Sequence, residues 1–271
     1  MQAILAPTMQ TLAVVSLRYP VSPDLEAWVL PEGKVPESTT HHATVYRIYG
    51  LLLAWVDRCR GERSLRIASD LAVRWLQEHP RTGADPDVCV LEPAPADFDD
   101  LNSLKLWEPG RVPPRLAIEV VSTNFPHKDY GRIQERYAAM GVEELVVFDP
   151  LLSGPRSLGG PVPLQLWRRD ATGAFERVQF GADPVHSGVL DAWFIANGRD
   201  LDISDDRLGK RCWLTGGERA EAAQAQAEQA RTQAEQAQAQ AEQAQAEAER
   251  ERQARLDVER RLSELESKLS R

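Results

Sequence analysis

Two short segments carry most of the structural information in this sequence: Ala84-Asp-Pro-Asp-Val-Cys-Val-Leu91 and Pro114-Arg-Leu-Ala-Ile-Glu-Val-Val-Ser122. Each contains a compact apolar run, which predicts a strand that is buried on both faces. Asp87 heads the first run and Glu119 lies inside the second. Because an unpaired carboxylate is costly to bury, these two acids are the first candidates for a functional site.

The elements on either side of these segments predict an α/β domain. Ser38 offers an N-cap, and apolar residues at helical spacing predict an amphipathic helix over 39–60, with a second helix over about 129–140. Strands are expected at 65–67, 71–75, 87–91, 116–121 and 144–149, with a hairpin formed by 164–168 and 175–180 and either a final strand or irregular structure over 189–201. This order of helix, strands, helix and strand favours a mixed central sheet flanked by helices.

Composition divides the chain into two parts. The last 54 residues contain no aromatic residue, glycine, proline or cysteine, and they carry 9 basic and 12 acidic residues out of totals of 32 and 41. The first 217 residues therefore carry 23 and 29, so neither part is a basic nucleic-acid arm. We expect an irregular arm over 1–24, one domain over 25–213, a linker over 214–217 and a helix over 218–271. The chain is Pro-rich and weakly periodic as far as about Ser38, and Trp28 and Leu30 are expected to dock this irregular stretch onto the domain.

The C-terminal helix shows a heptad pattern. With Ala227 at position a and Ala230 at d, the pattern continues to Ala248, is interrupted by Glu251 and Arg255, and resumes at Val258, Leu262, Leu265 and Leu269. Heptads sustained over about six repeats predict a self-associating coiled coil. An alanine seam buries little area, however, so a single solvated helix is the alternative.

Several classes of protein are disfavoured. Cys59, Cys89 and Cys212 are odd in number and widely spaced, which disfavours a disulfide framework or a zinc knuckle and favours the reducing cytoplasm. The mildly apolar stretch 4–17 is too short and too interrupted for an export signal or a membrane anchor. Phosphate-loop, Gly-x-Ser-x-Gly and His-Glu-x-x-His motifs do not occur in the sequence.

The acidic pair suggests metal chemistry. Two carboxylates on neighbouring strands can converge on a hard divalent cation, typically Mg²⁺, which stabilises the charge that develops as a phosphodiester is attacked. The alternative is an ordinary ion pair between Glu119 and a nearby arginine such as Arg115 or Arg132.

The ordered set of these motifs resembles the Uma-type putative restriction endonuclease family, a branch of the PD-(D/E)XK nuclease superfamily. The resemblance rests on 84–91, 114–122, 129–137 and Gly141-Val-Glu-Glu-Leu-Val-Val-Phe-Asp-Pro150, extends upstream to Pro36-Glu-Ser-Thr-Thr-His-His42, and covers roughly residues 25 to 205. It implies a restriction-endonuclease-like fold with a metal site at one end of the sheet. It also implies that Asp87 and Glu119 are ligands of Mg²⁺, with Mn²⁺ as a substitute.

This sequence departs from the family pattern at the catalytic lysine. The position two residues after Glu119 holds Val121, and the helix position that the family often uses, framed by Asp129 and Tyr137, holds Ile133. Nearby polar residues that are candidates for the missing role are Lys128, Arg132 and Gln134. Neighbouring helix positions point about 100° apart, so the pattern does not guarantee that any of them reaches the site.

Glu37 and His42 stand near the start of the first helix, where the family commonly has an acid and a histidine. Either residue is a candidate ligand or general base, and the alternative is an ordinary N-terminal helix region. His41, His127 and His186 are scattered and show no metal spacing.

The leading hypothesis is a Mg²⁺-dependent endonuclease that hydrolyses DNA, with water as the nucleophile. The competing hypothesis is a catalytically degenerate nuclease fold that serves as a binding or scaffold protein assembled by its coiled coil. Because the chain carries a net charge of −9, DNA contacts are expected to be local, weak and sensitive to salt.

Overall fold

The computed structural model describes residues 28–30, 38–59, 64–131 and 133–269. The chain divides into two compact units, Met1–Gly216 and Gly217–Arg271. Within the described residues, no helix has the length and apolar character needed to cross a membrane.

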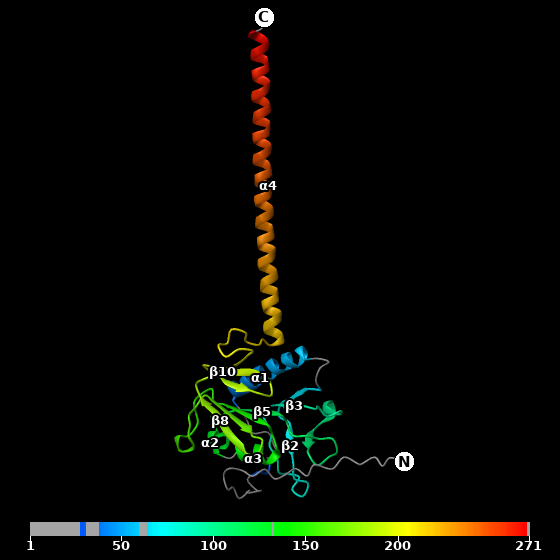
Figure 1. Ribbon diagram of the computed structural model, residues 1–271, viewed down its shortest axis with the longest axis vertical. Coiled ribbons are helices and arrows are strands. Elements are labelled where there is room, and N and C mark those ends of the chain that lie inside the picture. The colour runs from blue at the N-terminus through cyan, green and yellow to red at the C-terminus, as the bar shows by residue number, and fades with distance from the viewer. Residues whose placement is uncertain (1–27, 31–37, 60–63, 132, 270–271) are drawn as a thin grey trace, which may run out of the picture. The chain divides into compact units, whose positions relative to one another are not determined.

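The first unit is built on a six-stranded mixed sheet (Figure 1). Across the sheet the strands are β1 (Arg66–Ala68), β3 (Val88–Leu91), β5 (Leu116–Val120), β6 (Glu144–Phe148), β7 (Leu164–Arg169) and β8 (Phe175–Gly181). β5 and β6 run parallel, and each other neighbouring pair runs antiparallel. The predicted mixed central sheet is therefore confirmed, as is the hairpin of β7 and β8.

Two small sheets accompany the central one. A three-stranded antiparallel sheet consists of β9 (Val185–Ser187), β10 (Ala192–Asn197) and β11 (Asp200–Ser204), and a parallel pair consists of β2 (Ala72–Arg74) and β4 (Ser103–Lys105). Short 3-10 turns occur at η2 (Phe98–Asp100) and η3 (Arg156–Leu158). β4, β9 and β11 were not predicted, because their three to five residues give little periodicity.

The helices follow from local signals. α1 (Thr39–Arg58) begins after Ser38, whose hydroxyl accepts a hydrogen bond from the His41 main-chain N–H at 3.1 Å. Instead of one helix over 129–140, the structure has α2 (Pro126–Gly131) and α3 (Ile133–Met140). α2 starts earlier than predicted because proline, which has no N–H to leave unpaired, is favoured at the first position of a helix.

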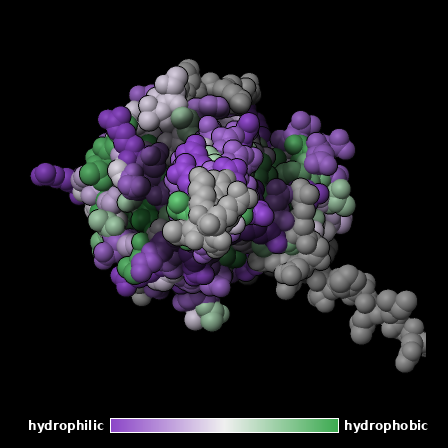
Figure 2. Space-filling model, turned by 90° about the horizontal axis from the view of Figure 1, so that it is seen from above, coloured by the Kyte–Doolittle hydropathy of each residue, from purple (hydrophilic) through white to green (hydrophobic). Residues whose placement is uncertain are grey.

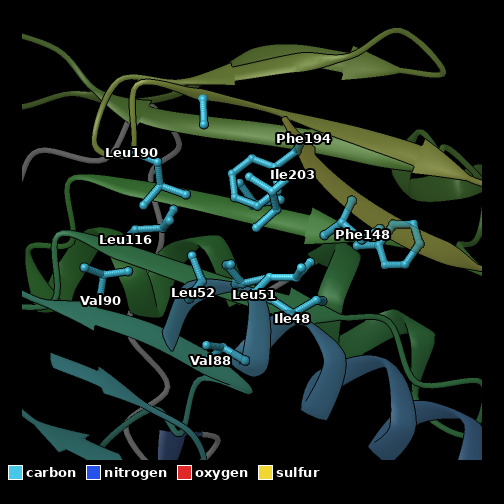
Figure 3. Close-up of a cluster of buried hydrophobic side chains, with 14 of the residues drawn as sticks. Ile48, Leu51, Leu52, Val88, Val90, Leu116, Phe148, Leu190, Phe194 and Ile203 are labelled. Carbon is cyan, nitrogen blue, oxygen red and sulfur yellow. The ribbon is translucent and has the colours of Figure 1, made fainter. Parts of the chain in front are cut away.

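A separate hydrophobic core lies on each face of the six-stranded sheet. Alternate strand residues such as Val88, Leu116 and Phe148 face α1 and the β9–β11 sheet, where Ile48, Leu51 and Phe194 meet them (Figure 3). The intervening residues, including Ala117 and Val121, face α2, α3 and the β2–β4 pair. This alternation, which follows from the two-residue period of a strand, determines the face to which each functional side chain points.

The two predicted docking residues of the N-terminal arm are buried. Trp28 and Leu30 expose 4% and 8% of their area, and the Trp28 ring lies 6.0 Å from that of Trp75. Trp28 belongs to the same core as α2 and α3, and the predicted irregular arm over 1–24 lies outside the described residues.

The second unit is a single long helix, α4, which begins at Gly216, two residues before the predicted start, and ends at Leu269. Its described side chains are almost all exposed. Hydrophilic residues dominate the face of the molecule shown in Figure 2, where hydrophobic residues form scattered patches. The helix is confirmed, and its pairing into a coiled coil remains a prediction.

Candidate functional site

The two acids singled out from the sequence lie opposite each other at one end of the sheet. β3 and β5 are antiparallel and pair Val88 with Ile118, so the same register, continued by one residue, sets Asp87 opposite Glu119. Directly opposed residues of an antiparallel pair point to the same face, with Cβ atoms about 5 Å apart. The carboxylates of Asp87 and Glu119 are therefore neighbours on the face that carries α2 and α3.

Asp87 is fixed at the point where the ladder between β3 and β5 ends. The next position on the β3 side, opposite Val120, is Pro86, which has no N–H to donate. The Val120 main chain instead donates its N–H to Asp87 Oδ2 at 2.6 Å, and its carbonyl oxygen lies 2.9 Å from His41 Nε2. Because a carbonyl only accepts hydrogen bonds, Nε2 of His41 carries the proton and donates it. His41 Nε2 also lies 3.4 Å from Asp87 Oδ2, so α1 and the sheet hold this carboxylate together.

Glu119 is buried and surrounded by negative charge. It exposes 1% of its area, lies on β5 on the same face as Ala117, and accepts a hydrogen bond from the Tyr137 hydroxyl of α3. Burial raises the pKa of Glu119 well above its ordinary value, and the negative charge of Asp87 raises it further. A carboxylate in this position is poorly stabilised by the protein alone and favours a nearby cation.

Lys128 of α2 supplies positive charge to the cluster. Its side chain is exposed at the surface, yet its pKa is raised, first by the negative charge of Glu119 and then by those of Asp129, Asp87 and Asp85, against the opposing effect of desolvation. The same lysine lowers the pKa of Glu119. Among the described candidates for the missing lysine, Lys128 is therefore the one whose positive charge acts on the acidic pair.

Asp129 is a third acidic residue whose charge acts on Glu119. It exposes 2% of its area, and its Oδ2 accepts a hydrogen bond from the Ser122 main-chain N–H at 3.2 Å. Burial raises the pKa of Asp129 to about 7; Lys128 opposes this rise and Asp87 adds to it. Gln134 donates its amide N–H to the Asp129 carbonyl at 2.9 Å, so this candidate links α3 to α2.

Both usual lysine positions are occupied by core residues. Val121 and Ile133 expose 3% and 2% of their area and pack in the core beneath α2 and α3. A lysine at either position would need to replace these packing contacts, whereas Lys128 is exposed and its charge acts on the acids from the surface.

Of the remaining predicted residues, one lies away from the acidic pair and the others lie outside the described residues. His42 is exposed on α1, one position and about 100° away from His41. Glu37 and Arg132 lie outside the described residues. The alternative in which Arg115 neutralises Glu119 is wrong, because Arg115 bonds Glu92 at 2.6 Å and Glu143 at 2.8 Å.

Sequence reasoning passed over His41, although a signal for it exists. His41 begins the buried stripe of α1, which continues through Val45, Ile48 and Leu52 at intervals of four, three and four residues. A histidine at such a position faces the core and not the solvent. Asp129 and Tyr137 do match the helix pattern of the resembled family, but the resemblance implied no role for either residue. Only the structure shows what each one contacts.

The donor set is compatible with a hard divalent cation. Among the described residues, no group of three or more His, Cys, Asp or Glu side chains is placed to hold a metal. Asp87 and Glu119 would thus bind an ion as two carboxylates, with water completing its coordination. Mg²⁺ commonly binds in this way, whereas structural Zn²⁺ sites need four protein ligands.

Comparisons with known proteins bear on the same region. A family model, Uma2, described as a putative restriction endonuclease, matches residues 17–158, which is just over half of the chain and includes both acids. Among solved structures, the chain is similar to a putative nuclease belonging to DUF820 from Anabaena variabilis ATCC 29413, with 13% identity, a TM-score of 0.39, and coverage of 58% of this chain and 76% of that one. This similarity is too distant to transfer residue roles. No curated protein matches the chain.

Proposed function

The chain belongs to the Uma2 family of putative restriction endonucleases, and we propose that it is a Mg²⁺-dependent endonuclease that hydrolyses DNA phosphodiester bonds. The observation that carries this proposal is the pair of opposed carboxylates at the end of β3 and β5. One of them, Glu119, is buried beside further negative charge, so its ionised form is poorly stabilised unless a cation lies nearby. Such an arrangement stabilises no fold by itself, and it is typical of a site that binds a metal ion.

Each residue of the cluster has a separate task in this proposal. Asp87 and Glu119 hold the ion, which would polarise the scissile phosphate and lower the pKa of the attacking water. Tyr137 donates to one oxygen of Glu119 and so orients its other oxygen. His41 positions Asp87 through the main chain of Val120.

In this proposal, Lys128 replaces the catalytic lysine that the superfamily pattern contains and this sequence lacks. Its raised pKa keeps it protonated near neutral pH, so it acts as a positive charge and not as a general base. An exposed ammonium beside two carboxylates can contact a non-bridging phosphate oxygen or orient the water. Lys128 lies on α2, seven residues beyond Val121, so its charge does not require a change in the buried core.

DNA is the expected substrate, bound through local contacts. With a net charge of −9, the chain lacks the general attraction for phosphates that strongly basic nucleases have. Affinity then depends on few phosphate contacts, and binding should weaken steeply with salt.

One observation favours a second function, a nuclease fold that binds without cleaving. Both usual lysine positions hold buried apolar residues, Val121 and Ile133. If Lys128 does not replace the missing group, Asp87 and Glu119 would bind an ion as a structural or DNA-docking element with no turnover. The two functions differ in one outcome, which is whether the metal-loaded protein converts supercoiled plasmid to nicked or linear DNA.

The test is plasmid nicking by the purified full chain, titrated with Mg²⁺ and separately with Mn²⁺. We expect metal-dependent nicking that is lost in Asp87→Asn and Glu119→Gln. Asp100→Asn, which changes an exposed acid of η2 away from the site, is the matched control and should nick like the wild type. Equal nicking by the wild type and both site variants would show that a contaminating nuclease is responsible and would remove the catalytic assignment. Metal binding without nicking by the wild type would favour the second function.

A further inference from the structure

The last turns of α4 expose large apolar side chains. Leu256, Val258, Leu262 and Leu265 have 49%, 57%, 53% and 59% of their area accessible. Val258, Leu262 and Leu265 follow one another at intervals of four and three residues, so they lie on one stripe of the helix. Leu256 points to another side. An apolar stripe on an otherwise polar helix is typical of a surface that another helix covers.

We propose that α4 pairs with α4 of a second copy of this chain in a parallel, in-register, two-stranded coiled coil. The exposed stripe continues the heptad pattern that begins with Ala227 at position a and Ala230 at d. Val258 and Leu265 occupy d positions, and Leu262 occupies an a position. The alanines allow close approach of the two helices, and the leucine end supplies most of the buried area.

Charge complementarity supports a second copy as the partner. In a parallel dimer, residue g of one helix faces residue e of the next heptad on the other helix. Two of these pairs carry charge on both sides: Glu247 with Arg252, and Arg261 with Glu266. Each of these two pairs joins an acidic to a basic residue. Each remaining g–e pair contains at least one uncharged residue. The chain thus contains no like-charged g–e pair that would oppose its own pairing.

The positions of the apolar and polar layers fix direction and register. Full-length antiparallel pairing would set the leucine end against the alanine end, where the layers do not match in size. A shift of one heptad in a parallel pair would set Arg255 against Leu262, which buries a charge against an apolar side chain. In register, Glu251 meets Glu251 and Arg255 meets Arg255 of the second copy; because these two like-charged layers are adjacent, each Glu251 can pair with Arg255 of the other helix, and such polar layers select the alignment at some loss of stability.

The consequence is an assembly with two copies of the first unit attached to the same end of one coil. Pairing itself requires no catalysis, so it can be true whether or not the proposed nuclease function holds. If both hold, each particle carries two sites, which is what cleavage of two DNA strands requires.

The first experiment measures the mass of the full chain in solution by light scattering. We expect a dimer, and Leu262→Asp combined with Leu265→Asp should raise the dimer dissociation constant by about a hundredfold or more. Leu256→Asp, the same change at a similarly exposed leucine off the stripe, is the control and should remain dimeric. Because the last 54 residues contain no tryptophan, Trp fluorescence reports separately that the first unit stays folded. A monomeric wild type, or a dimer that survives the double substitution, would overturn the proposal.

The second experiment tests direction. Ala230→Cys and Val258→Cys place thiols at two d positions, and oxidised peptides are identified by mass spectrometry to separate them from Cys59 and Cys212. A parallel in-register pair links each new cysteine to its own copy at both positions. An antiparallel pair cannot do so at both, and that result would overturn the assigned direction. Arg261→Glu should weaken pairing, and adding Glu266→Arg should restore it.

Discussion

Replacement of Glu119 by glutamine should stabilise the metal-free protein while it abolishes nicking. The carboxylate is fully buried and its pKa is raised well above the ordinary value by burial and by the charge of Asp87. Glutamine has nearly the same shape, carries no charge and can still accept the hydrogen bond from Tyr137. The substitution therefore removes the repulsion and retains the packing, as expected at a site where function opposes stability.

The magnitude follows from the geometry of the two strands. Unit charges about 5 Å apart, as for directly opposed residues, repel each other by about 3 kcal/mol at an effective dielectric constant of about 20. Lys128 offsets part of this repulsion, so we expect a gain of about 1 to 2 kcal/mol in the free energy of unfolding, or a rise in Tm of about 3 to 6 °C.

The effect should depend on pH. The pKa of Glu119 is raised on folding, so the buried carboxyl destabilises the wild type least at low pH. The wild type then loses stability as pH rises above the ordinary glutamate value of 4.5. Glutamine does not titrate. The advantage of Glu119→Gln should therefore be small at pH 4 and largest at pH 8, and saturating Mg²⁺ should raise the Tm of the wild type alone.

Glu144→Gln is the matched control because Glu144 is equally buried, exposing 1% of its area, but is satisfied by protein groups. It accepts hydrogen bonds from Arg168 Nε at 2.8 Å and Ser187 Oγ at 2.6 Å. The same substitution should here destabilise by about 2 kcal/mol. Thermal unfolding followed by Trp fluorescence measures both variants. A Glu119→Gln protein that is destabilised to the same extent as Glu144→Gln at pH 8 would refute the argument that Glu119 is held in an unfavourable state.

Three further predictions concern the neighbours of the acidic pair. Lys128→Met should reduce the nicking rate about a hundredfold with Tm little changed, and Lys128→Arg should recover part of it. His41→Ala should lower the free energy of unfolding by about 1 to 3 kcal/mol, because it leaves the carbonyl of Val120 unpaired. His42→Ala, on the exposed face of α1, is the control and should change it by less than about 0.5 kcal/mol. Thermal melts measure both variants. Because the pKa of Asp129 is raised to about 7, the free energy of unfolding of the metal-free wild type should fall by roughly 1 to 4 kcal/mol from pH 4 to pH 7. Denaturant titrations at a series of pH values measure this fall, and it should be smaller in Asp129→Asn.

The sequence by itself determined the elements whose periodicity is strong. The apolar runs around Asp87 and Glu119 predicted β3 and β5, Ser38 predicted the start of α1, and the aromatic-free composition predicted α4. These features depend on side-chain period and capping within one segment, which a linear pattern displays directly. The acidic pair could be found for the same reason, since a carboxylate inside an apolar run is visible without a structure.

Only the tertiary structure decided which side chains surround that pair. The family resemblance made His42 a candidate, with an ordinary helix N-terminus as the alternative, but the rotation of α1 points His41 inward, to the main chain of Val120. It proposed Arg115 as a partner of Glu119, but Arg115 is engaged by Glu92 and Glu143. The physical reason is that strand register, helix rotation and the end of the β3–β5 ladder are set by packing across the sheet, between residues that are distant in the chain. Sequence spacing shows neighbours along one element, whereas the groups that act on the charge of Glu119 come from three places: Asp87 before β3, Lys128 and Asp129 on α2, and Tyr137 on α3.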